Sequence, residues 1–340
     1  SINKVDSETG DKVQGGASLE NAEFTVKYYA GYYNAGNLPA NATRTWVIKT
    51  LKTAGGNYMA ALNNTCKVSG DDFYKVSNGT VVLPLGTISI EETKAPEGYN
   101  LDGAYLQVGG VGEKITGKYV AQITQNGNLA QLKGGNTFKV SDKIKRGDFK
   151  LTKIDTDNQN RMSDIPFRVT CKGTGESHII KTDENGYFSS ASSWNAHDSN
   201  TNANDWALTA SDTIDSTKLD ANAGFWFGNN SVLDGNGTTS TSDAVKADNK
   251  LGALPFDTYS IEELRCSANE GYALINTTVT VTRDAKTIDL GTFDDPEPEI
   301  HTTAYDASDS DHYVGVGTVK ISDKVEYSHC LLYTSPSPRD

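Results

Sequence analysis

The chain has 340 residues and a formal net charge of −13, from 31 basic and 44 acidic side chains. This length exceeds one ordinary sandwich domain and predicts about two or three domains. The negative charge argues against nucleic acid and anionic membranes as partners, because like charges repel. Hydrophobic residues make up 36% of the chain, enough for packed cores. No apolar run approaches the roughly 18 residues that a membrane-spanning helix needs.

An internal repeat defines the expected domains. Three segments recur in the same order: KVD at 4–6 and KID at 153–155, LPLGTISIEE at 83–92 and LPFDTYSIEE at 254–263, and EGY at 97–99 and 270–272. Two copies of one module are therefore expected in tandem, at 1–146 and 147–298. The second copy carries an insertion at 195–250, whose Asn, Asp, Ser, Thr and Gly content is typical of a long loop.

Short alternating segments bounded by Gly, Asn or Pro predict strands in both copies. In chain order they are 22–29, 45–50, 80–83, 87–92, 118–123, 136–140, 149–153, 166–171, 178–182, 258–264, 277–282 and 288–293. Helical periodicity is missing. The expected class is all-β, with two antiparallel immunoglobulin-like β-sandwiches. Residues 299–330 add two strand-like runs, too few to close a sandwich, and read as a truncated third β domain.

Side-chain alternation along a strand places one acid of each Glu-Glu pair in the core. In the first copy Glu92 shares a face with two isoleucines, and in the second Glu263 shares a face with Tyr259 and Ile261. Burying a lone carboxylate costs several kcal/mol, so each acid should be protonated or paired.

The outer strands of each copy add a second acid and a lysine. Asp142 and Asp294 fall on the apolar faces of the expected closing strands, and Lys4, Lys150 and Lys153 lie on the opening strands. Alternation favours Lys153 over Lys150 as the inward lysine. Two acids in one core need a cation or a shared proton.

These segments resemble the collagen-adhesin B-type (Cna B-type, SpaA-like pilin) domain, which has a prealbumin-like fold. The match is carried by KLTKID at 150–155, IEETKAPEGY at 90–99, YSIEELRCSANEGY at 259–272 and a closing strand that ends in Asp. In this family a first-strand Lys and a last-strand Asn or Asp form a spontaneous isopeptide bond. The second Glu of the Glu-Glu pair in the same domain catalyses this reaction. The resemblance covers residues 1–298.

The resemblance implies site residues in both copies. The catalytic acids would be Glu92 and Glu263. The cross-link would join Lys4 to Asp142 in the first copy, and Lys150 or Lys153 to Asp294 or Asp295 in the second. The family places its reactive lysine three residues before the Lys-x-Asp lysine. That position is Lys150 in the second copy and Ser1 in the first, so the first copy offers Lys4 alone.

Two segments at the end of the chain, 299–330 and 331–340, have resemblances of their own. Residues 299–330 resemble the start of a VaFE-type repeat, through Thr302-Thr303-Ala304 and ISDKV at 321–325. In that family a Thr near the start forms an ester with a Gln on the last strand, and this Gln is expected beyond the truncation. Residues 331–340, LLYTSPSPRD, break the pattern and resemble translated sequencing-adapter read-through.

Other motifs argue against a cofactor or metal. The segment DGNG at 234–237 hints at a calcium loop but lacks the Gly and closing Glu that such a loop requires. The five His show no ligand spacing. Cys171 and Cys266 are either one disulfide or, more simply, separate thiols. Nucleophile-elbow, zinc-protease and phosphate-loop motifs are absent, so no turnover enzyme is expected.

Two functions from different classes fit these observations. The leading one is a structural stalk segment of a Gram-positive cell-surface adhesin or pilin-like protein, extracellular and wall-anchored, stiffened by autocatalytic Lys–Asp isopeptide bonds. Its partners would be neighbouring domains of the same protein. The alternative is a ligand-binding adhesin module. It would use the 195–250 loop, with Phe225, Trp226 and Phe227 exposed to a host or environmental protein or glycan. Burial of Trp226 would instead make these aromatics a cover for the sandwich.

Overall fold

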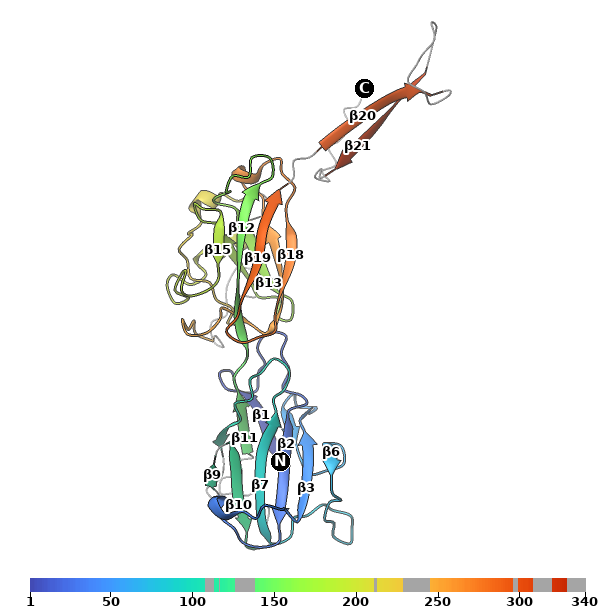
Figure 1. Ribbon diagram of the computed structural model, residues 1–340, viewed down its shortest axis with the longest axis vertical. Coiled ribbons are helices and arrows are strands. Elements are labelled where there is room, and N and C mark those ends of the chain that lie inside the picture. Colours follow the sequence, from blue (N-terminus) through green and yellow to red (C-terminus); the bar gives the residue numbers. More distant parts are fainter. Residues whose placement is uncertain are drawn as a thin grey trace.

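The computed structural model describes residues 1–107, 113–115, 117–125, 138–210, 213–228, 245–295, 299–307 and 320–328. Over these residues, strands and short 3-10 helices form two β-sandwich modules that lie end to end, with a hairpin beyond the second (Figure 1). The first module contains β1 (Ile2–Asp6), β2 (Glu23–Tyr29), η1 (Ala35–Asn37), β3 (Arg44–Lys49), β4 (Leu51–Lys52), β5 (Tyr58–Ala60), β6 (Lys67–Gly70), β7 (Gly86–Lys94), β8 (Ala104–Gln107), β9 (Glu113–Ile115), β10 (Lys118–Ile123) and β11 (Phe138–Asp142). The second contains β12 (Arg146–Asp155), β13 (Pro166–Cys171), β14 (Ser177–Lys181), β15 (Tyr187–Ser189), η3 (Ala203–Thr209), η4 (Ser216–Lys218), β16 (Leu254–Pro255), β17 (Asp257–Glu263), η5 (Ser267–Asn269), β18 (Asn276–Val281) and β19 (Thr287–Asp295). The hairpin consists of β20 (Glu299–Asp306) and β21 (Ile321–Ser328).

In the first module two sheets enclose one core. Their strand orders are β4-β5-β1-β11-β8 and β6-β3-β2-β7-β10-β9. Phe24, Trp46 and Val140 are fully buried between them. The first and last strands, β1 and β11, are parallel neighbours, and their register pairs Lys4 with Val140. The strands that begin and end the module therefore lie side by side.

The second module repeats this arrangement. One sheet has the order β14-β13-β17-β18, and in the other β12 lies between β15 and the last strand, β19. Again the first and last strands are parallel, with Lys153 paired to Phe293. The all-β sandwich class predicted from alternation is confirmed, because both modules consist of facing sheets.

Most predicted strands are present, and the misses are short or irregular. The segment 80–83 is not a strand: its Val81 makes only an isolated bridge to Lys75. Seven strands of two to four residues were not predicted: β4, β5, β6, β8, β9, β15 and β16. Such short segments carry too little alternation to be recognised, and pairing with longer neighbours defines them.

Arg146 opens β12 and joins the two modules. Its guanidinium is buried: Nη2 donates to Gln14 Oε1 of the first module at 3.1 Å and to Phe227 O of the second at 2.8 Å. Its Nη1 donates to the carbonyls of Gly252 and Ala253, at 3.3 and 3.2 Å. An apolar cluster beside it also crosses the junction, formed by Val13, Ala17, Leu19, Tyr58, Tyr99, Ile144 and Phe256. The junction is therefore packed and hydrogen-bonded rather than a bare linker.

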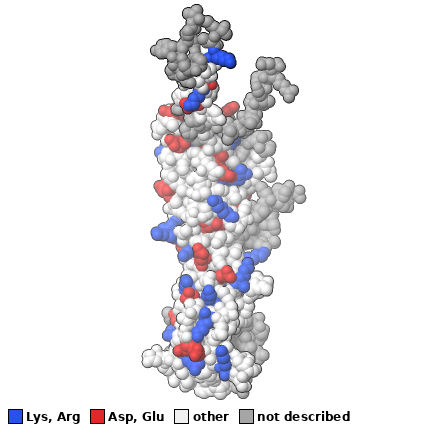
Figure 2. Space-filling model, turned by 90° about the vertical axis from the view of Figure 1, so that its right-hand side faces the viewer, with Lys and Arg blue, Asp and Glu red and all other residues white. Residues whose placement is uncertain are grey.

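The surface carries both signs of charge. On the face in Figure 2, acidic and basic side chains alternate along the length of the molecule without a single-sign patch. No helix in the described ranges has the length and apolar character to cross a membrane.

Beyond the second module, β20 and β21 pair antiparallel over eight residues, and Ile321, Val325 and Tyr327 of β21 are exposed. Residues 331–340 and the 234–237 segment lie outside the described residues.

Candidate functional site

The structure brings together Lys4, Glu92 and Asp142 in the core of the first module. Lys4 Nζ lies 2.8 Å from Glu92 Oε2 and 2.8 Å from Asp142 Oδ1. The side chains of Lys4 and Asp142 are 0% exposed, and that of Glu92 is 1% exposed. An amine and two carboxyl groups thus meet where solvent does not reach.

Strand alternation explains why these three side chains meet. Lys4 on β1 and Asp142 on β11 belong to one sheet, in which Asp142 is paired with Asp6, two residues beyond Lys4. Glu92 comes from β7 in the facing sheet, on the same face as the buried Ile88 and Ile90. Alternation predicted both acids on inward faces, and both are inward.

The environment keeps Glu92 protonated at neutral pH. Burial, the largest effect, raises the pKa of Glu92 to about 8; the Lys4 charge opposes this rise, and the neighbouring Asp142 carboxyl adds to it. The arrangement at pH 7 therefore places a neutral Glu92 beside the Lys4 amine and the Asp142 carboxyl group. Such a set can carry out acid-assisted condensation of the amine with the Asp142 carboxyl group.

Backbone amides complete the site. Gly103 N donates to Asp142 Oδ1 at 2.8 Å, and Asp102 N lies 3.3 Å from the same oxygen. These donors were not predicted, because a pattern of side chains carries no information about which peptide N–H groups a loop aims inward.

A second missed feature links the two recurring motifs. Tyr99 of the first EGY segment donates to Asp6 Oδ2 at 2.9 Å, and Tyr272 of the second donates to Asp155 Oδ2 at 3.0 Å. The Asp of Lys-x-Asp thus binds the Tyr of EGY in both modules. The repetition of both motifs was the available signal, and the contact fixes the loop after the Glu-Glu strand against the first strand.

In the second module Lys153 and Glu263 are both buried in the core. The Lys153 side chain donates to Ile154 O at 3.2 Å. Glu263 accepts from Asn269 Nδ2 at 2.8 Å and from Ile275 N at 3.2 Å. Both side chains therefore occupy the inward faces that alternation predicted.

Lys150 and Asp294 do not lie in this core. The Lys150 side chain is 38% exposed and pairs with Asp289 at 3.1 Å, because it alternates with the buried Phe149 and Leu151. The prediction that Asp294 faces the core is wrong: it is exposed. The cause is a register shift opposite Lys150–Thr152, where Gly291 has φ +77°. This bulge reverses the alternation of the strand's last residues.

Beyond the bulge, the backbone register points to Asp295. In the first module the acid partner, Asp142, is paired with the Asp of Lys-x-Asp. In the second module the residue paired with the corresponding Asp155 is Asp295, whereas Asp294 is paired with Ile154. Asp295 is thus the register equivalent of Asp142, although its side chain lies outside the described atoms.

The aromatic residues of the insertion do not form a surface patch. Phe225, Trp226 and Phe227 are 4%, 3% and 0% exposed and belong to the core of the second module. The Arg146 guanidinium lies over the Trp226 ring, with Arg146 Cζ 3.9 Å from the ring centroid. The prediction of an exposed ligand-binding patch on these three residues is therefore wrong: the loop folds back and covers the sandwich.

His178 on β14 connects the insertion to the sandwich through hydrogen bonds. Its Nδ1 lies 2.8 Å from Asp205 Oδ2 and its Nε2 lies 3.0 Å from Glu176 Oε1. Its ring packs edge-on against Phe227, with centroids 4.6 Å apart. Burial alone would lower the pKa of His178, but the bonds to Asp205 and Glu176 outweigh it and raise the pKa to about 9.

We expect the free energy of unfolding to fall as pH rises from about 6.5 to about 9 through loss of the His178 proton. A group whose pKa is higher in the folded state contributes stability that is complete below its unfolded pKa and is lost as pH passes its folded pKa. The contribution is at most about 3 kcal/mol. Urea unfolding across this range measures it, and His178→Gln should flatten the slope. A variant with the wild-type slope would show that His178 is not the titrating group.

Cys66, Cys171 and Cys266 are buried free thiols, so the Cys171–Cys266 disulfide is not formed. Within the described residues no cluster of His, Cys, Asp or Glu could hold a metal ion.

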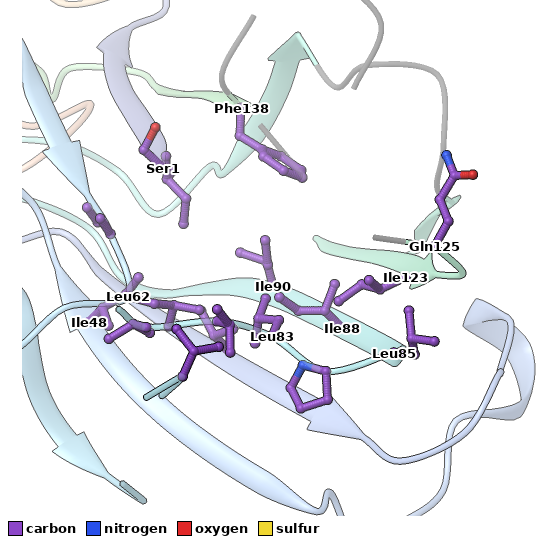
Figure 3. A pocket seen from close by; sticks show the side chains of 18 residues that line it. Ser1, Ile48, Leu62, Leu83, Leu85, Ile88, Ile90, Ile123, Gln125 and Phe138 are labelled. Atoms are coloured by element: carbon purple, nitrogen blue, oxygen red, sulfur yellow. The ribbon is translucent and has the colours of Figure 1, made fainter. Parts of the chain in front are cut away.

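A cavity of about 650 Å³ opens between the sheets of the first module. Figure 3 shows its lining by aliphatic side chains and Phe138, with Ser1 and Gln125 as the polar members.

Comparisons with known proteins found likeness to solved structures only. No family model and no curated protein matches the chain. The Bacillus anthracis TIE protein matches over 87% of this chain at 16% identity and a TM-score of 0.40, and the chain spans 34% of that protein. GBS52, the minor pilin of Streptococcus agalactiae, matches over 87% of this chain and 95% of its own, at 11% identity and a TM-score of 0.25. A C-terminal fragment of the pilus adhesin SpaC from Lactobacillus rhamnosus GG matches over 87% and 96%, at 13% identity and a TM-score of 0.35.

Proposed function

We propose that this chain is a stalk segment of a Gram-positive surface protein and that its first module cross-links itself by an isopeptide bond between Lys4 and Asp142. The observation that carries the proposal is the position of Lys4 Nζ, 2.8 Å from both Glu92 Oε2 and Asp142 Oδ1, in a site closed to solvent. The bond would join the parallel first and last strands, so tension applied at the ends of the module would load a covalent bond.

The reaction begins with a proton transfer inside the pair. Moving one proton from the Lys4 ammonium to the Asp142 carboxylate gives a neutral amine and a neutral acid without changing the net charge of the site. The amine then attacks Asp142 Cγ, a C–N bond forms, one C–O bond breaks, and one water leaves. Glu92 gives a proton to the departing oxygen and receives one from the nitrogen. Fixed placement of both reactants in the core supplies the effective concentration that free reactants lack.

The second module is proposed to form a bond of the same kind, between Lys153 and Asp295 with Glu263 as the acid. The buried Lys153 and Glu263 and the backbone register of Asp295 support it. The chain as a whole would then lose two waters, one from each module. Residues 299–330 are proposed as part of a further β domain of the VaFE type, and the protein is proposed to be anchored to the cell wall.

The second bond has matched controls within the same strands. Lys153→Met should restore one water to the intact mass because it removes the reacting amine, whereas Lys150→Met should leave the mass loss unchanged because that side chain faces solvent. Asp295→Ala should behave like Lys153→Met, and Asp294→Ala should not. Intact-mass spectrometry of the four variants checks this, each against its own sequence mass. Loss of the bond in Asp294→Ala with retention in Asp295→Ala would reverse the assignment.

The two proposed bonds are tested together by the mass of the wild-type chain. Cross-linking makes the folded protein lighter than its sequence by one water for each bond. Denaturation does not reverse an amide bond, so the loss should persist in denaturant. A protein with the full sequence mass would contradict cross-linking in both modules.

A further inference from the structure

We propose that the backbone N–H of Gly103 is a catalytic group of the first module, which holds the Asp142 oxygen that remains in the amide and stabilises the negative charge that develops on it. This inference rests on the proposed Lys4–Asp142 cross-link. It is carried by the hydrogen bond from Gly103 N to Asp142 Oδ1, 2.8 Å long and buried, with Asp102 N 3.3 Å from the same oxygen.

The two oxygens of Asp142 have different surroundings. Oδ1 receives the Gly103 N–H and lies 2.8 Å from Lys4 Nζ. Oδ2 is buried and has no hydrogen-bond partner in the described part of the chain, and the same is true of Glu92 Oε1. Buried carboxyl oxygens in native proteins normally have a donor. A proton shared between the two carboxyl groups supplies one, which makes Oδ2 the oxygen that Glu92 protonates and Oδ1 the oxygen that stays.

In the proposed reaction the Gly103 N–H acts on Oδ1 and Glu92 acts on Oδ2. When the Lys4 nitrogen attacks Asp142 Cγ, the electron pair of the C=O bond moves onto Oδ1, where the Gly103 N–H receives the charge. Oδ2 already carries the proton that came from Lys4; Glu92 donates a second proton to it, the C–Oδ2 bond breaks, and water departs. The electron pair returns from Oδ1 to restore the C=O bond, and a proton from the nitrogen passes to Glu92. A donor fixed at the developing oxyanion typically contributes about 100-fold to 1,000-fold in rate.

The loop around Gly103 is built to hold this N–H in place. Backbone bonds tie it to the segment after β11: Asn100 N donates to Lys143 O at 2.9 Å, and Lys145 N donates to Gly98 O at 2.8 Å. Gly103 has φ +53°, a left-handed conformation that favours glycine. A Cβ at this position would lie 3.5 Å from Glu92 Oε2, so the residue packs directly on the catalytic acid.

The test replaces the N–H by oxygen. Incorporating glycolic acid in place of Gly103 by cell-free translation turns one amide into an ester and removes only the donor. The matched control is the same change at Gly56, which also has a positive φ, +85°, and whose N–H donates to Thr53 O at 2.9 Å in an exposed turn. The full chains, each carrying Lys153→Met so that only the first module can react, are captured in denaturant and diluted to start folding, and the loss of one water is followed by intact mass. We expect the Gly103 ester to react about 100-fold more slowly or worse, and the Gly56 ester to react at the wild-type rate.

The possible results distinguish a failure of the Gly103 role from a failure of the Lys4–Asp142 cross-link. A wild type that loses water, together with a folded Gly103 ester that reacts equally fast, overturns the role of Gly103 and leaves the cross-link standing. A wild type that keeps its water in the first module overturns both. Tryptophan fluorescence, to which the first module contributes the buried Trp46, reports whether the ester chain folds. If it does not, the crystal structure of the wild type decides: an amide oxygen within about 3.2 Å of Gly103 N supports the role, and one turned away from it contradicts it.

Discussion

Replacing Glu92 by Gln should leave the chain one water heavier than the wild type and lower the free energy of unfolding by about 5 kcal/mol. Gln keeps the shape of the side chain but has no acidic proton to give to the departing oxygen. Without the bond, Lys4 and Asp142, about 140 residues apart in sequence, no longer restrict the unfolded chain, and the loop-entropy model gives the loss of stability. Intact mass and urea unfolding of the same sample measure the two effects.

The matched control is Glu91→Gln on the same strand. Glu91 points to the opposite face, where its carboxylate lies 3.6 Å from Lys118 and 40% of its side chain is exposed. Exposed ion pairs contribute up to about 1 kcal/mol, so this variant should keep the wild-type mass and nearly the wild-type stability. Equal masses for the Glu92 variant and the wild type would show that Glu92 does not catalyse the reaction.

Replacing Arg146 by Met should destabilise the second module by about 3 to 5 kcal/mol. The buried guanidinium satisfies Gln14 Oε1 from one module and the carbonyls of Phe227, Gly252 and Ala253 from the other. Met fills much of the volume but donates no hydrogen bond, so four buried acceptors lose a partner. For a module of this size the melting temperature should fall on the order of 10 °C, and calorimetry should show the two modules unfolding in more widely separated transitions.

Arg168→Met provides the comparison for this second variant. The Arg168 side chain is 41% exposed and makes one ion pair, 3.1 Å from Nε to Glu262 Oε2. Its loss should cost about 1 kcal/mol or less. If Arg146→Met were as mild as Arg168→Met, the junction between the modules would not depend on the buried guanidinium.

Sequence alternation placed the two acids of the first-module site because β7 and β11 keep their alternation up to Glu92 and Asp142; the register shift of β7 lies just beyond Glu92, between its pairs with Phe24 and Glu23. Glu92 and Asp142 each continue an alternation with buried neighbours, so their direction follows from parity, whereas Lys4 was the lysine that the family resemblance offered. In the second module the same reasoning selected Lys153 and Glu263 but failed at Asp294. A one-residue bulge at Gly291 intervenes, and a sequence pattern does not reveal where a strand gains a residue relative to its partner.

Two other features depended on tertiary structure. Phe225, Trp226 and Phe227 stand among polar residues in the sequence, and only the fold of the insertion shows that they return to the core. The donors from Asp102 and Gly103 are peptide groups, whose direction depends on how the Tyr99–Asp6 contact holds the preceding loop. Both features arise from contacts between segments far apart in the chain, which local periodicity does not encode.

The most direct test of the central claim is to locate the bond itself. Proteolysis of the wild-type protein followed by tandem mass spectrometry should yield a branched peptide in which the segment around Lys4 is joined to the segment around Asp142, lighter by one water than the sum of the two. Fragment ions should assign the loss to these two side chains. Recovery of both segments only as separate linear peptides, each at its full mass, would contradict the cross-link and with it the account of the first module as a covalently closed stalk domain.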